Sequence, residues 1–142
     1  MRCVSPPLLC ALLLAACAVP GPGADPRSGS ALDGSELNGS WGGAHVGLLL
    51  SPSGGSIEYD CAHGTLDAAV IPDAGGAFRV AGRHVREHGG PERAGEQPPS
   101  LPALYEGSVA GNRMQLRVHV GADTLGPFTL QRDAGAQVFK CL

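Results

Sequence analysis

One segment of the sequence alternates polar and apolar residues strictly, from Arg113 to Val120. Successive side chains of a β-strand point to opposite faces, so this period of two predicts a strand with one buried and one solvated face. Residues 56–61 repeat the pattern, and Phe78, Val80 and Gly82 share one face of another run. No stretch has the period of an amphipathic helix, which predicts an all-β chain of about eight strands. The remaining runs with strand character are residues 40–50, 65–70, 104–109, 128–131 and 137–141.

Turn signals separate these runs at short intervals. Gly111-Asn112 is a tight hairpin signal, and Asp133-Ala134-Gly135 suits a three-residue loop with glycine in the left-handed conformation. Only residues 86–102 form a long connection, which is charged and rich in Gly and Pro. Short connections favour antiparallel neighbours. We therefore expect a small antiparallel up-and-down β-barrel, with a β-sandwich as the alternative.

The N-terminal residues have the composition of a secretion signal. Arg2 precedes an unbroken apolar run from Leu8 to Ala18, which is shorter than the roughly 20 residues that span a bilayer. The run contains Leu14-Ala15-Ala16-Cys17, which resembles a bacterial lipobox. The resemblance implies removal of residues 1–16 and attachment of a lipid, with acyl chains such as palmitate, to Cys17. The alternatives are ordinary cleavage after Ala18, giving a secreted protein, and a buried helix of the fold.

The segment that follows the lipobox differs in composition from the rest of the chain. Residues 17–38 are rich in Gly, Pro and Ser and lack apolar periodicity, which predicts a flexible tether. Residues 39–142 then make up the barrel domain. Ala18, the residue after the lipid-bearing position, is not Asp, which in a bacterium with two membranes resembles an outer-membrane destination. We therefore expect a lipid-anchored protein of the bacterial cell envelope.

The cysteines divide into groups with different expected fates. Of the five in the chain, two lie in the signal and Cys17 takes the lipid, so Cys61 and Cys141 remain. An even pair in an oxidising compartment predicts one disulfide, with two independent buried thiols as the alternative. With eight alternating strands, both cysteines fall at one rim of the barrel. The tether and the loop of residues 86–102 would lie at that rim too.

Two short matches point to families of small barrels. Gly39-Ser40-Trp41 resembles the G-x-W start of lipocalins and the similar start of avidins, both eight-stranded ligand-binding barrels. That resemblance implies a ligand cavity, with Trp41 as a candidate lining residue; the alternative for Trp41 is a plug at the base of the barrel. His45, among apolar residues of the same run, is a second candidate. The first hairpin loop, at residues 51–55, is shorter than the one that shapes the ligand mouth in lipocalins.

The cysteine layout resembles a third family. Tyr59-Asp60-Cys61 together with Cys141 near the C-terminus is similar to the membrane-anchored inhibitors of C-type lysozyme, which are small bacterial lipoproteins with an eight-stranded barrel. The resemblance implies that architecture and the inhibition of a secreted hydrolase. The inhibitory loops of that family carry Ser and Lys and have no counterpart here, because Lys140 is the only lysine of the chain. We therefore carry over no inhibitory residues.

Two motifs bear on catalysis. His84-Val85-Arg86-Glu87-His88 matches the H-x-x-E-H pattern of zinc peptidases. That chemistry needs a helix to bring both histidines to one metal, whereas the flanking glycines and proline predict a strand that ends in a polar loop. Asp60-Cys61-Ala62-His63-Gly64 contains a Cys and a His, but a cysteine committed to a disulfide cannot act as a nucleophile. We expect a tight turn there.

The remaining composition argues against other functions. His45 could line a pocket or bind a metal with His63 or His119; the alternative is that these histidines are structural or exposed. A net charge of −3 excludes the basic face of a nucleic-acid binder. The chain has no G-x-S-x-G motif, no phosphate-binding glycine loop before a helix and no distinct carboxylate pair. We expect no catalytic residues, no metal and no cofactor.

These observations lead to a ranked set of hypotheses. The leading one is a non-catalytic, lipid-anchored envelope protein that binds a protein partner or a small ligand. The second is an inhibitor of a secreted hydrolase such as lysozyme, acting through residues 86–102 or a barrel rim. A secreted small-ligand-binding barrel is a further alternative. A metal-dependent enzyme that uses His84 and His88 ranks last.

The lipid anchor can be tested by substitution. Cys17→Ser removes the thiol that acylation requires but leaves an ordinary cleavage site intact. We expect the variant to be lost from the membrane fraction and recovered in soluble form, as followed by cell fractionation. Membrane attachment that survives the substitution would show the lipobox interpretation to be wrong.

Overall fold

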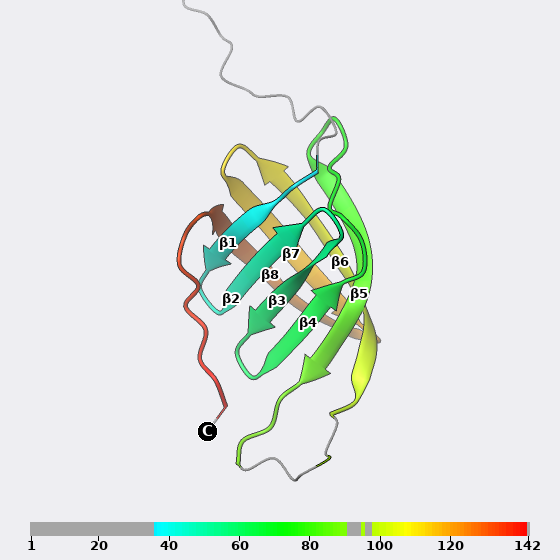
Figure 1. The fold of residues 1–142 in the computed structure, drawn as a ribbon, viewed down its shortest axis with the longest axis vertical. Coiled ribbons are helices and arrows are strands. Elements are labelled where there is room, and N and C mark those ends of the chain that lie inside the picture. The colour runs from blue at the N-terminus through cyan, green and yellow to red at the C-terminus, as the bar shows by residue number, and fades with distance from the viewer. Residues whose placement is uncertain (1–35, 91–94, 96–97, 142) are drawn as a thin grey trace, which may run out of the picture.

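The computed structural model describes residues 36–90, 95 and 98–141. Within this part of the chain, eight antiparallel strands follow one another in sequence order and close into a barrel (Figure 1). The all-β up-and-down barrel is thus confirmed, and the sandwich alternative is wrong. No helix among the described residues is long and apolar enough to cross a membrane. The strands are β1 (Gly39–Gly43), β2 (Val46–Ser51), β3 (Gly54–Tyr59), β4 (Ala62–Leu66), β5 (Ala77–Arg86), β6 (Ser100–Ala110), β7 (Arg113–Val120) and β8 (Asp123–Arg132).

The polar–apolar alternation sorts side chains between interior and surface as expected. In β7, Met114, Leu116 and Val118 are buried, while Arg113, Gln115 and Arg117 face solvent. β5 follows the same pattern over most of its length. The inward side chains of all eight described strands contribute to one hydrophobic cluster, which is the core.

Inward-facing glycines make room for a large ring in that core. Tyr105 of β6 is fully buried, and its hydroxyl donates a hydrogen bond of 2.7 Å to the carbonyl oxygen of Arg83. A Cβ on Gly64 would lie 2.3 Å from the Tyr105 hydroxyl oxygen, and a Cβ on Gly82 would lie 2.7 Å from its ring. The absence of side chains at both positions therefore makes room for Tyr105, and at Gly82 also for the Thr65 carbonyl oxygen, which would lie 2.0 Å from the added Cβ.

Three of the expected strands are different in the structure, and the expected strand of residues 65–70 overlaps only the end of β4. Residues 40–50 form two strands, β1 and β2, because the chain reverses at Ala44 and His45, where His45 has a φ of 66°. Residues 137–141 are not a strand but part of an irregular C-terminal segment. The total of eight strands agrees with the expectation, because residues 40–50 form two strands in place of one and residues 137–141 form none. The sequence did not indicate the turn at Ala44 and His45, because the glycines around it fit a glycine-rich strand equally well.

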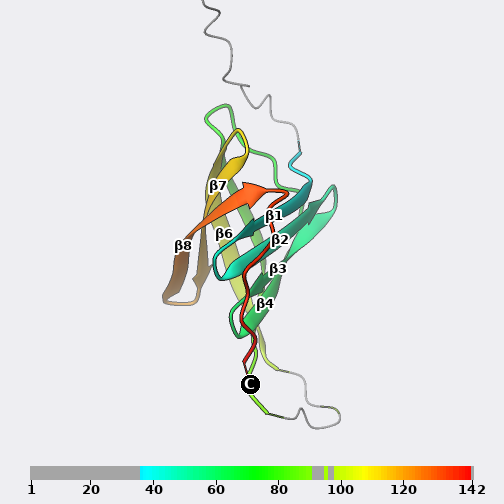
Figure 2. The same ribbon diagram turned by 90° about the vertical axis from the view of Figure 1, so that its left-hand side faces the viewer.

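The C-terminal segment, residues 133–141, runs back along the outside of the barrel, and we call it the strap (Figure 2). It begins at Asp133, which has a φ of 58°, so the left-handed residue of this turn is not Gly135 as predicted. The Gln137 N–H donates to the Gly43 carbonyl oxygen at 3.0 Å, and the His45 N–H donates to the Gln137 carbonyl oxygen at 2.9 Å. These bonds attach the strap to the end of β1.

A pair of outward-facing glycines lets the strap approach the sheet. Gly42 and Gly47 are partners in the register of β1 and β2. A Cβ on Gly42 would lie 2.3 Å from the Ala134 carbonyl oxygen, and a Cβ on Gly47 would lie 2.7 Å from the Ala136 Cβ. No real side chain fits at such separations. The outer face of the β1–β2 hairpin is therefore shaped to hold the strap.

The two ends of the barrel are built differently. At one end, Trp41 is 1% exposed, and the Arg132 guanidinium lies 4.6 Å from the centroid of its ring. Leu37, just before β1, pairs with Val70 at this end. The chain therefore enters the barrel opposite the β3–β4 turn that holds Cys61, not at its rim as expected. The signal of residues 1–16, the lipobox with Cys17 and residues 17–35 of the tether lie outside the described residues.

The fit between strap and hairpin can be tested at Gly42. We expect Gly42→Ala to lower the free energy of unfolding by about 1–3 kcal/mol, the usual effect of overpacking a tight contact, because the strap backbone must move. Gly135→Ala is the matched control, since nothing lies within 4 Å of the added Cβ. Urea denaturation of both variants measures the difference. Equal stabilities would contradict the close approach of the strap.

Candidate functional site

The disulfide lies at the end of the barrel opposite Leu37. Cys61, in the β3–β4 turn with a φ of 56°, is bonded to Cys141 of the strap, 80 residues away in sequence. The predicted bridge is present, but its geometry is not the predicted one. Cys141 does not sit on a strand that neighbours β1 in the barrel wall; the strap carries it across the outer surface to Cys61.

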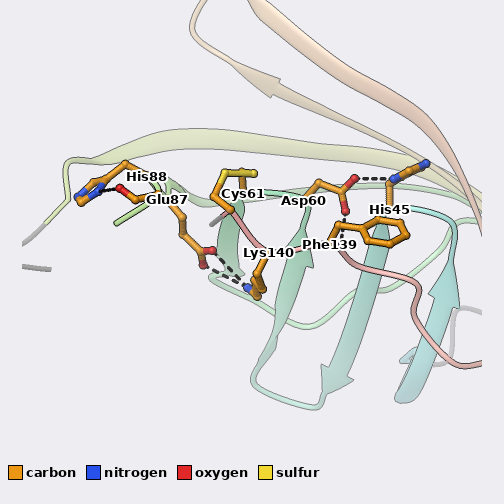
Figure 3. The surroundings of a disulfide bond; sticks show 9 residues. His45, Asp60, Cys61, Glu87, His88, Phe139 and Lys140 are labelled. Carbon is orange, nitrogen blue, oxygen red and sulfur yellow. Dashed lines mark hydrogen bonds and ion pairs between the residues drawn. A yellow bond between two sulfur atoms is a disulfide. The ribbon is translucent and has the colours of Figure 1, made fainter. Parts of the chain in front are cut away.

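Polar contacts hold the end of the strap beside the disulfide (Figure 3). The Asp60 carboxylate accepts a hydrogen bond of 2.7 Å from the Phe139 N–H and lies 2.5 Å from His45 Nδ1. Lys140 Nζ contacts the carboxylates of Glu58 and Glu87. The Phe139 ring lies 5.9 Å from the His45 ring, centroid to centroid. The strap therefore forms part of the rim at this end.

The same contacts determine the charge of the rim. The Phe139 N–H and the His45 side chain lower the pKa of Asp60. The His63 side chain, at 2.9 Å, and Lys140 lower the pKa of Glu87. Both effects favour the charged form of a carboxylate. At neutral pH the rim therefore carries two carboxylates that are already hydrogen-bonded or ion-paired.

A pocket of about 300 Å³ opens at this end of the barrel. It lies between the ends of β3, β4 and β5 on one side and β8 on the other. Its deeper lining is aromatic and aliphatic, and its outer lining is charged. The lining residues are His45, Tyr59, Asp60, Cys61, Ala62, His84, Arg86, Glu87, Leu125 and Phe128.

Three rings line the interior of the pocket. Tyr59 is central, with its ring centroid 5.5 Å from that of His84 and 5.7 Å from that of Phe128. The ring planes are tilted by 50° and 37°, within the range in which aromatic rings attract one another. The three rings therefore form a preformed apolar surface.

Two polar atoms of these rings, both fully buried, have no hydrogen-bond partner among the described residues. Tyr59 and His84 are each 4% exposed, yet the Tyr59 hydroxyl and His84 Nδ1 are unbonded. Leaving a buried donor or acceptor unpaired costs about 1–3 kcal/mol, so native structures rarely contain such atoms. Trp41 Nε1 is a third such atom among the described residues, but it lies outside the pocket.

Burial also sets the protonation of the two groups. Burial, reinforced by the nearby Tyr105 phenol, raises the pKa of Tyr59 far above its ordinary value. Burial lowers the pKa of His84, and the positive charge of Arg86 and the nearby His63 lower it further. At neutral pH the interior of the pocket therefore presents a neutral phenol and a neutral imidazole.

The structure separates the residues that the sequence singled out for binding. His45 lines the pocket, where its side chain is bonded to Asp60 at the rim. Trp41 is buried near the opposite end and is not among the lining residues. Its position under Arg132 agrees with the alternative role of a plug. Sequence reasoning did not select Tyr59 or Phe128, although the inward phase of Tyr59 follows from the alternation in residues 56–61.

The motifs that suggested catalysis have other roles in the fold. His84 belongs to β5 and His88 follows the strand, so the helix that an H-x-x-E-H metal site requires is absent from this segment. Cys61 is disulfide-bonded, which leaves no thiol to pair with His63. The described residues contain no group of three or more His, Cys, Asp or Glu side chains that could hold a metal ion.

Comparison with protein-family models, with curated proteins and with solved structures finds no match to this chain.

The buried Tyr59 hydroxyl, which has no hydrogen-bond partner among the described residues, predicts that its removal does not lower the stability of the protein. Tyr59→Phe removes an unpaired hydroxyl, so we expect the free energy of unfolding to stay unchanged or to rise by about 1 kcal/mol. Tyr105→Phe is the matched control; it removes a hydroxyl bonded to Arg83 and should lower stability by about 1 kcal/mol. Thermal or urea unfolding measures both. An equal loss in the two variants would show that the Tyr59 hydroxyl has a structural partner.

Proposed function

We propose that this chain is a non-catalytic binding module of the bacterial cell envelope, lipid-anchored through Cys17, that binds a small molecule in the pocket at the disulfide end of the barrel. The observation that carries the proposal is the preformed surface of three rings, Tyr59, His84 and Phe128, in the interior of the pocket. Leu125 and Ala62 add aliphatic surface to this lining.

A ligand in this pocket would cover the three rings and remove their apolar surface from water. Sites that combine an apolar lining with a few placed polar groups are typical of small-molecule binding. The polar groups of this pocket are the side chains of His45, Asp60, Arg86 and Glu87.

The position of the pocket is compatible with an anchored protein. Leu37 and Val70 meet at the end of the barrel remote from the pocket. Residue 36 and the residues after it enter the barrel at that remote end, so the pocket mouth lies at the end opposite this point of entry. Access of a ligand to the pocket does not require the barrel to leave the membrane.

Inhibition of a secreted hydrolase stays a second proposal, because two exposed apolar side chains lie at the same end as the pocket. Leu101 at the start of β6 is 46% exposed, and Phe139 of the strap is 67% exposed. Isolated exposed apolar residues are common, so these two alone are a weaker argument than the pocket. Retention of a lysozyme or another secreted hydrolase on the immobilised chain would favour this second function.

Small-molecule binding can be tested by NMR on the full chain carrying Cys17→Ser, which lacks the lipid attachment site. We expect members of a library of small apolar molecules to shift the resonances of Tyr59, His84 and Phe128. Leu125→Trp should abolish these shifts, because the larger side chain fills the pocket. Leu49→Trp is the control, since Leu49 is 57% exposed on the outer face of β2. The proposal fails if no library member shifts these resonances, or if Leu125→Trp leaves binding intact.

A further inference from the structure

We propose that the Cys61–Cys141 disulfide is a redox-sensitive site: a dithiol reduces it in the folded protein, and reduction releases residues 138–141 of the strap from the rim of the pocket. We call these four residues the strap end. Reduction would alter the rim whether or not a ligand binds in the pocket. Three observations support this site: the position of the disulfide, the composition of the core and the small number of noncovalent contacts that the strap end makes.

The disulfide lies at the surface of the barrel and not in its core (Figure 3). Cys61 occupies the β3–β4 turn and Cys141 the strap, and both residues are half-buried. Cys61 is also one of the residues that line the pocket. Thiol–disulfide exchange begins when a thiolate reaches one of the two sulfurs. A half-buried disulfide beside an open pocket gives a reductant that access without unfolding of the barrel.

The hydrophobic core of the barrel contains no part of the strap. All residues of the core cluster lie between Leu37 and Leu130 in the sequence, and no described residue of the strap is buried. The eight strands close into a barrel through pairs that do not include the strap. Reduction therefore removes a link across the outer surface and leaves the apolar packing of the barrel in place.

The noncovalent contacts of the strap end are few and exposed. The Phe139 N–H donates to the Asp60 carboxylate at 2.7 Å, and Lys140 Nζ contacts the carboxylates of Glu58 and Glu87. Exposed ion pairs contribute little to stability, because water competes for both partners. Ordering a segment of chain costs conformational entropy at every residue. Without the disulfide, we therefore expect the strap end to leave the rim.

The earlier part of the strap is held in another way. The Asp133 N–H donates to the Ser40 carbonyl oxygen at 2.8 Å, and Gln137 exchanges backbone hydrogen bonds with Gly43 and His45. These bonds join the strap to β1 and to the turn after it, and they do not involve the disulfide. Release should therefore begin after Gln137 and leave residues 133–137 in place.

Release of the strap end changes the rim of the pocket. Asp60 loses the Phe139 N–H, Glu87 loses Lys140, and the His45 ring loses its contact with the Phe139 ring. Asp60, Glu87 and His45 all line the pocket. The pKa of Asp60 should rise on release, because the hydrogen bond from the Phe139 N–H is the largest cause of its lowered value. The state of one covalent bond thus decides which groups the rim presents.

The reduction is a two-electron exchange with a dithiol. A thiolate of the dithiol attacks one sulfur of the Cys61–Cys141 bond, which breaks as a mixed disulfide forms. The second thiol of the reductant then displaces the protein sulfur, and the reductant leaves as a disulfide. Two electrons and two protons pass to the protein, which carries two thiols afterwards. Proteins with a reduced Cys-x-x-Cys motif are reductants of this class.

Dithiothreitol tests the proposal on the full chain carrying Cys3→Ser, Cys10→Ser and Cys17→Ser, in which Cys61 and Cys141 are the only cysteines. After treatment without denaturant, alkylation with iodoacetamide and mass spectrometry count the free thiols. We expect both thiols to be alkylated and the amides of β5 and β6 to keep their protection from hydrogen exchange. The Phe139 amide should exchange at least about tenfold faster, whereas the Gln137 amide should stay protected.

A variant separates the effect of the broken bond from other effects of the reductant. Cys141→Ser in the same chain should fold, show the fast exchange of the Phe139 amide and raise the pKa of Asp60 in an NMR titration. Dithiothreitol added to this variant is the control and should change nothing further. Cys61→Ser breaks the same bond from the barrel side and should give the same exchange pattern. The reduced parent chain needs neither variant, so the test holds even if one of them does not fold.

Three results would each overturn the proposal. The first is a disulfide that dithiothreitol reduces only when the barrel unfolds. The second is loss of protection in β5 and β6 once the bond is reduced. The third is a Phe139 amide that stays protected in the reduced protein. None of the three bears on small-molecule binding, which the library and Leu125→Trp test separately.

Discussion

Closure between β1 and β8 is the constraint on which the rest of the structure depends. These two strands pair only at Trp41 with Arg132 and at Gly42 with Gln131, whereas β5 and β6 pair along nearly their whole length. A barrel without such closure would leave two open sheet edges. The strap adds to this short seam, because Asp133 donates to the Ser40 carbonyl oxygen and Gln137 donates to that of Gly43. The disulfide holds the far end of the strap in place, so strap and seam support each other.

The same short seam explains where the pocket lies. Residues 123–130 of β8 do not pair with β1, and two of their side chains, Leu125 and Phe128, line the pocket instead. At the other end the interior is filled by Trp41, and in the middle by Tyr105 over its two inward glycines. The barrel is therefore packed along most of its length and open only where closure is incomplete. The rings and aliphatic side chains that line this opening are the physical basis of the proposed function.

The sequence-based predictions were accurate where the structure of a segment depends on its own residues, and wrong where it depends on contacts with distant parts of the chain. The alternation of Arg113–Val120 was enough to predict β7, because a period of two reports which face is buried without reference to the rest of the chain. The hairpin turn at Gly111 was equally local, and Gly111 has a φ of 60°. Residues 40–50 were misread as one strand, since the reason for their glycines is the strap, nearly a hundred residues away. In the sequence, the pocket residue His84 was considered only as part of the H-x-x-E-H motif. In the structure its ring lies beside that of Tyr59 in β3, which in turn lies beside that of Phe128 in β8.

By itself, the sequence determined the all-β class, the antiparallel up-and-down order and the pairing of Cys61 with Cys141. Periodicity, turn residues and cysteine count carry this information, and each is a property of short segments or of composition. Only the tertiary structure decided that the C-terminal residues form a strap, that the chain enters opposite the disulfide, and that the Tyr59 hydroxyl and His84 Nδ1 remain unpaired beside a pocket. Those features depend on which distant groups meet after the barrel closes, and no local pattern records the presence or absence of such a partner.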